Sequence, residues 1–63
     1  MALKKRQKII LAALVELGGE ATTRQIAEKA NLNVNGVSQS LGAMLQVICL
    51  GGRGGETKWR IKT

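Results

Sequence analysis

The sequence predicts an α+β fold that is mostly helical: three helices and a small antiparallel sheet, in a single domain of residues 1–63. Three observations favour it. Apolar residues recur at helical spacing in three segments, one tight turn separates the second segment from the third, and residues 47–62 change to a β pattern interrupted by glycines. A chain of 63 residues is enough for one small core and no more, because so short a chain buries only about 60% of its unfolded surface.

The composition indicates a globular, basic protein without catalytic groups. Hydrophobic residues make up 44% of the chain and the net charge is +6, while His, Tyr and Phe are absent and Cys49 is the single cysteine. Zinc sites need several Cys, His or carboxylate ligands, and a Cys nucleophile usually needs a His. We therefore expect no enzyme, metal, cofactor or small-molecule ligand. Cys49 is interpreted as a small core residue, and one thiol fits a reducing compartment.

The first helix is predicted from an apolar stripe that follows a basic start. The stripe consists of Leu3, Ile10, Ala13, Leu14 and Leu17. The apolar run 9–15 after basic residues imitates a signal peptide, but seven residues cannot span a membrane. We expect a soluble protein without a membrane partner. Gly18 and Gly19 close the helix, and residues 20–21 then begin a short stretch that could supply a third strand.

Helix 1 has more apolar residues than one inward stripe requires. Those outside the stripe are Ile9, Leu11, Ala12 and Val15. Two interpretations stay open. Some of these side chains could pack under the hairpin, or the surface could be the contact between two copies in a homodimer.

Helix 2 and the turn after it are predicted from capping residues. Thr22 can accept from the backbone three residues on, while the side chain of Gln25 can reach back to Thr22, which is a capping box. Asn31 tolerates a left-handed backbone, Leu32 fills the space between two helices, and Asn33 is a good N-cap. Helix 3 therefore begins directly after this turn.

Helix 3, expected over about residues 34–46, has two distinct faces. The inward stripe consists of Val37, Leu41 and Met44, flanked by Val34 and Leu45. The outward stripe consists of Asn35, Gln39, Gly42 and Gln46, with Ser38 at its edge. The outward stripe is polar, uncharged and small.

The remaining residues, about 47–62, predict a β-hairpin with a glycine-rich tip. In its second strand Thr57, Trp59 and Ile61 point one way, and Lys58, Arg60 and Lys62 point the other way. We expect Trp59 to be the large core residue, with its N–H near a surface acceptor.

This order of elements resembles the winged helix-turn-helix family across essentially the whole chain. The resemblance is carried by Thr22-x-x-Gln25-Ile26-Ala27, by Leu32-Asn33-x-x-x-Val37-Ser38-Gln39-x-Leu41 and by Trp59-Arg60-Ile61. Small prokaryotic and archaeal transcriptional regulators show this layout. The resemblance implies a helix-turn-helix over residues 22–45, a third helix that recognises double-stranded DNA in the major groove, and a hairpin that is the wing.

The layout is also similar to that of Zα domains, which run from a Thr-Thr cap through a recognition helix to a wing Trp. Zα domains use an Asn, an Arg or Lys, and a Tyr on that helix, with a Pro-Pro pair in the wing. This chain has Ser38, Gln39 and Gly42 there, and it contains no proline. The similarity therefore implies the fold and not the preference for left-handed DNA.

Base contacts are expected from the outward stripe of helix 3. Side-chain amides pair with adenine edges in the major groove, so Asn35 and Gln39 are the first candidates. Gly42 would let the helix axis approach the groove, and Ser38 could contact a base or a phosphate. The alternative is that these side chains are simply solvated.

Backbone contacts are expected from the basic residues near this helix. Arg24 lies in the first turn of helix 2, Arg53 at the glycine-framed wing tip, and Lys58 and Arg60 on the strand after the tip. Phosphate neutralisation by such residues supplies most of the affinity for DNA. A solvated basic face is again the alternative.

Between Lys29 and Arg53 the chain has no charged residue. This keeps open a second hypothesis, a winged-helix protein–protein interaction module without sequence-specific DNA binding. The charge excess in the N-terminal segment and the wing favours the first hypothesis, a DNA-binding transcriptional regulator in the cytoplasm, associated with the nucleoid.

Overall fold

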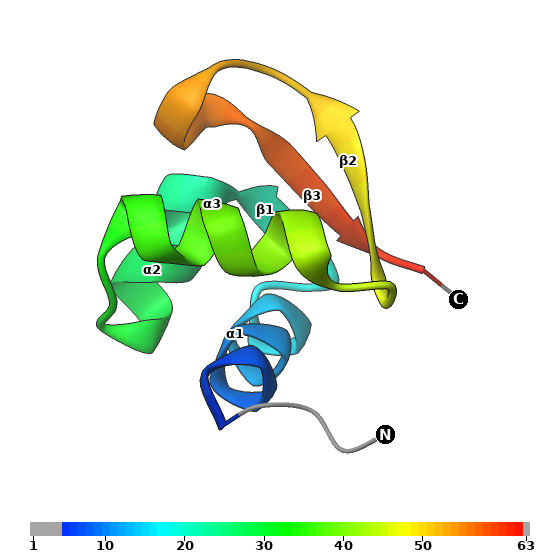
Figure 1. The fold of residues 1–63 in the computed structure, drawn as a ribbon. Helices are drawn as coiled ribbons and strands as arrows, with labels where there is room; N and C mark the ends of the chain where they lie inside the picture. Colours follow the sequence, from blue (N-terminus) through cyan, green and yellow to red (C-terminus); the bar gives the residue numbers. More distant parts are fainter. Residues whose placement is uncertain (1–4, 63) are drawn as a thin grey trace.

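The computed structural model describes residues 5–62 and has the predicted class of fold, α+β and mostly helical (Figure 1). The elements in chain order are α1 (Lys5–Glu16), β1 (Glu20–Thr22), α2 (Thr23–Ala30), α3 (Val34–Ala43), β2 (Val47–Gly51), the 3-10 turn η1 (Gly54–Glu56) and β3 (Lys58–Ile61). This order is consistent with a winged-helix topology. Leu3, predicted to belong to the first apolar stripe, lies outside the described residues.

The predicted capping residues begin both helices of the helix-turn-helix. The N–H of Gln25 donates to Thr22 Oγ1 at 3.2 Å, and the N–H of Thr22 donates to Gln25 Oε1 at 2.9 Å. Asn31 takes the left-handed conformation with φ 57°, and the side chain of Asn33 accepts from the N–H of Asn35 at 2.8 Å. The capping box, the turn and the second N-cap are thus confirmed.

The three strands form one antiparallel sheet in the order β1-β3-β2. The stretch after α1 does supply the third strand, because Ala21 of β1 pairs with Trp59 of β3. On the other side of β3, Ile48 of β2 pairs with Arg60. The central strand therefore alternates as predicted, with Trp59 buried and its charged neighbours exposed.

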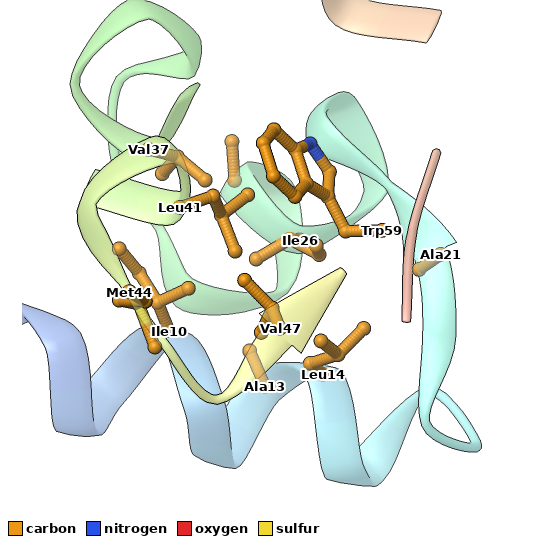
Figure 2. Packing of buried hydrophobic residues seen from close by; sticks show 11 residues of the cluster. Ile10, Ala13, Leu14, Ala21, Ile26, Val37, Leu41, Met44, Val47 and Trp59 are labelled. Atoms are coloured by element: carbon orange, nitrogen blue, oxygen red, sulfur yellow. The ribbon is translucent and has the colours of Figure 1, made fainter. Parts of the chain in front are cut away.

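The core lies between the three helices and the inner face of the sheet (Figure 2). Its buried members are Ile10, Ala13, Leu14, Ala21, Ile26, Ala27, Val37, Leu41, Met44, Val47 and Trp59. Trp59 is the large core residue, as predicted, but the prediction of a surface acceptor for its N–H is wrong. The indole Nε1 donates at 2.8 Å to Oγ1 of Thr23, which is itself fully buried.

Helix 3 is shorter than predicted, since α3 ends at Ala43, Met44 is its C-cap and residues 45–46 form a turn. Met44 leaves the helix with ψ 129° and still places its side chain in the core. Leu45 is consequently 87% exposed and does not flank the inward stripe. The carbonyl of Gln46 accepts from Lys62 N at 2.7 Å, so Gln46 lies in the turn that leads into β2 and not on the outward stripe of the helix.

The prediction that Cys49 is a core residue is also wrong, because its side chain is exposed. Cys49 pairs with the buried Trp59, so it lies on the inner side of the sheet by register. However, β2 is an edge strand and has a neighbouring strand on one side only. A period-two pattern identifies the side of a strand, but not whether that strand is central or at an edge.

Candidate nucleic-acid interface

The face of α3 opposite the core is exposed, polar and uncharged. Val37 and Leu41 fix the rotation of the helix, because both side chains are completely buried. Asn35, Gln39 and Gly42 are therefore exposed, as predicted, and Ser38 is half-buried at one side. A Cβ added at Gly42 would meet no atom within 4 Å, so nothing in the described chain covers this part of the helix.

Arg6 of α1 lies beside α3, a position that sequence analysis missed. Its Nη1 is 3.6 Å from the point where a Cβ of Gly36 would be. An open groove between the two helices is lined by Arg6, Gln7, Gln39, Ser40 and Ala43. The N-terminal basic residues gave no sequence signal for this contact, since it depends on how α1 packs across α3. A guanidinium group thus borders the neutral face of α3.

On the other side, the tip of the hairpin lies against the helix-turn-helix. The turn η1 contacts both α2 and α3, and Figure 1 shows it near the start of α3. Arg24 of α2 extends along this tip: Nη1 is 3.4 Å from Glu56 Oε1, and Nε is 3.3 Å from a Cβ built at Gly55. Arg24 therefore has a carboxylate partner that the sequence did not indicate, but its side chain remains 60% exposed.

Three of the four carboxylates pair with a basic residue at the surface. Besides the Arg24 pair, Lys58 Nζ lies 3.5 Å from Glu20 Oε2, and Lys29 Nζ lies 3.8 Å from Glu16 Oε2. Within residues 5–62 the other basic side chains make no ion pair. They form an α1 group (Lys5, Arg6 and Lys8) and a hairpin group (Arg53, Arg60 and Lys62).

The structure does not bring the four predicted backbone-contact residues together. Arg53 directly precedes η1 and is exposed, so it lies at the tip with Arg24. Lys58 begins β3 next to this tip. Arg60 lies further along β3, opposite Glu20, and borders a hollow that includes Gly18 and Gly19. Arg60 is therefore near the turn between α1 and β1, away from the hairpin tip.

The predicted contact surface on helix 1 is smaller than expected. Ile9 and Val15 are 39% and 59% exposed, and Ala12 is exposed as well. Leu11, in contrast, packs against the core and does not belong to that surface. What remains is interspersed with the basic residues of the α1 group.

Comparison with known proteins gives no relative: no protein-family model, no curated protein and no solved structure matches this chain. None of the helices within residues 5–62 has the length and apolar character needed to cross a membrane. The function is therefore argued from the fold and from the surface chemistry around α3.

Proposed function

We propose that this protein is a member of the winged helix-turn-helix family that binds double-stranded DNA and acts as a transcriptional regulator. The observation that carries this proposal is the surface around α3. A neutral, polar helix face is bordered by Arg6 on one side and by a hairpin tip with Arg24 and Arg53 on the other. These cations come from segments far apart in the chain.

Base recognition belongs to α3 in this proposal. A helix fits the major groove of B-DNA, where Asn and Gln amides pair with the N6 and N7 edge of adenine. Asn35 and Gln39 are both exposed and lie one helical turn apart, and Ser38 is at the edge of the same face. At Gly42 the missing side chain lets the helix backbone come close to the base pairs.

Affinity comes mainly from cations that contact phosphates. Arg6 and the tip residues flank α3, so they can contact the backbone when the helix lies in a groove. Arg24 can exchange its exposed carboxylate partner for a phosphate at little cost, because surface ion pairs contribute only about 0–1 kcal/mol. Glycines beside Arg53 let it enter the minor groove or follow a phosphate chain.

The test is a titration against duplex DNA at several salt concentrations. With about four to six phosphates engaged, log K should fall with log salt at a slope of roughly −4 to −5. Arg6→Ala should weaken binding to all duplexes alike and reduce the slope by about one. Lys29→Ala is the matched control, since Lys29 pairs with Glu16 of α1 and is not among the cations assigned to phosphate contact. Absence of binding at low salt would refute the proposal.

The second candidate is a winged-helix module that binds another protein through α3. One observation favours it: residues 30–52, which include the whole of α3, carry no charge. The double variant Asn35→Ala/Gln39→Ala distinguishes the two. Loss of base preference with general affinity retained supports DNA recognition, whereas unchanged behaviour toward every duplex supports the protein-binding module.

A further inference from the structure

Within residues 5–62, no strand pairs with the outer edge of β2. Lys62 N donates to Gln46 O, which shows that the backbone carbonyl of Gln46 points toward the chain that continues from β3. In an antiparallel ladder the backbone groups of successive residues alternate in direction, so the N–H and C=O of Ile48 also point toward β3. The N–H and C=O of Val47 and Cys49 then point away from the sheet, toward the side where no described strand lies.

The side chains of β2 leave this edge unprotected. Proteins usually guard an exposed edge with a charge, a proline or a bulge. The strand Val47–Gly51 has no charged residue and no proline, and its single irregularity falls between Cys49 and Gly51. Ile48 and Leu50 are 43% and 47% exposed, and Leu45, just before the strand, is 87% exposed. Three of the five large apolar side chains that are exposed among the described residues therefore lie on β2 or just before it.

We propose that β2 is a homodimer contact, in which it pairs antiparallel with β2 of a second copy and extends the sheet to six strands. The regular part of the strand is Val47–Cys49, so the two-fold axis passes at its centre, Ile48. Val47 of each copy then exchanges backbone hydrogen bonds with Cys49 of the other. The two Ile48 residues meet as a non-hydrogen-bonded pair, with Cα atoms about 4.5 Å apart.

A second copy fits this edge better than a charged partner does. Two-fold antiparallel pairing is self-complementary, since each copy offers the same donors, acceptors and isoleucine. Like charges do not oppose it, although the chain has a net charge of +6. The nearest cation on the same face is Arg60, opposite Ile48 on β3. Across the dimer the two β3 strands, which carry Arg60, are three strand spacings apart. That distance, about 14 Å, exceeds the Debye length in physiological salt.

The contact is short, so the dimer is expected to be weak and concentration-dependent. Stable interfaces bury about 800 Å² per partner, and one five-residue strand with a neighbouring leucine supplies less. Sedimentation of the chain without DNA should show monomer at about 10 µM and a growing dimer fraction toward about 1 mM. This measurement does not depend on DNA binding, so its failure and the failure of the proposed function are distinguishable.

Cysteine cross-linking tests the register. In a Cys49→Ser background, Ile48→Cys places two thiols at a Cα separation within disulfide range, so mild oxidation should give a covalent dimer. Leu50→Cys in the same background is the matched control. Its two copies lie about 13 Å apart along the strands, so cross-linking should be at least about tenfold slower. Equal rates for the two variants would overturn the proposed pairing.

A charge substitution tests the surface itself. Ile48→Lys should abolish the concentration-dependent dimer, whereas Val15→Lys on the exposed side of α1 should not. Trp59 fluorescence, which reports the core, should be unchanged in both. A wild-type chain that is monomeric at about 1 mM, a dimer that survives Ile48→Lys, or a dimer lost in Val15→Lys would each overturn the proposal. The last result would instead assign the contact to α1.

Discussion

Thr23 is a polar side chain with no exposed surface, and it joins the first turn of α2 to β3. Its Oγ1 donates to the carbonyl of Thr57 at 3.1 Å and accepts from Trp59 Nε1 at 2.8 Å. The backbone N–H of Thr23 donates to the same carbonyl at 2.8 Å. One hydroxyl thus allows the largest core side chain to be buried without an unpaired N–H.

Thr23→Val should therefore destabilise the protein by about 1–3 kcal/mol, because it preserves shape but leaves the buried indole N–H without an acceptor. Urea unfolding followed by circular dichroism measures the change. Thr57→Val is the matched control. It removes a hydroxyl without breaking a side-chain hydrogen bond, and it leaves the backbone carbonyl of Thr57, which accepts from Thr23, in place. Equal stability of the two variants would show that the hydroxyl does not hold Trp59.

At the scale of elements, the sequence predicted the starts of α2 and α3 but not the end of α3. The starts of α2 and α3 depend on local groups, Thr22 with Gln25 and Asn33 with the backbone two residues on. After the end of α3 the contacts are with distant residues: Met44 places its side chain in the core, and the carbonyl of Gln46 accepts from Lys62 N. Burial at the edge has the same origin: the exposure of Cys49 follows from strand order, which alternation does not encode.

The helix to which we assign base recognition, α3, should show a conflict between stability and binding. Gly42→Ala should stabilise α3 by up to about 0.5–1 kcal/mol, because glycine is a poor helix former. Its φ is not positive, and the new Cβ meets nothing within 4 Å. In the proposed complex the added methyl group keeps the helix backbone from the base pairs, so affinity for DNA should fall several-fold. Thermal unfolding and DNA titration of one preparation measure both effects.

Gly36→Ala is the control for this experiment, because it adds the same methyl group to the same helix on the side of α1. Its Cβ would lie 3.6 Å from Arg6 Nη1, an ordinary contact. It should raise stability as well but weaken binding less than Gly42→Ala. If Gly42→Ala binds DNA as tightly as wild type, then the exposed face of α3 does not approach a groove.

For the whole molecule, the candidate surface was only partly predictable. Periodicity identified the exposed residues of α3, because a buried stripe determines its opposite face. It did not show that Arg6 borders that face or that Glu56 pairs with Arg24, since both contacts depend on packing between elements. The sequence grouped Arg60 with the other expected backbone contacts on the strand after the tip, whereas the antiparallel register places Arg60 opposite Glu20, toward the other end of the sheet.

The distribution of charge over the molecule leads to a prediction about the free protein. Repulsion among the α1 group, the hairpin group and the other cations opposes folding in a chain with a net charge of +6. The three ion pairs act in the opposite sense, but their partners are about half exposed or more, so they contribute little. Added salt screens the repulsion and should stabilise the free protein, although it should weaken the proposed binding to DNA.

The free energy of unfolding in urea should therefore rise by on the order of 0.5 kcal/mol between about 10 and 200 mM NaCl. The variant Lys5→Gln/Lys8→Gln/Lys62→Gln should lose most of this rise, because it removes cations that have no carboxylate partner within residues 5–62. If stability falls with salt instead, attraction in the three ion pairs exceeds the repulsion. Repulsion among the unpaired cations would then not destabilise the free protein, and binding to phosphates would have no such repulsion to relieve.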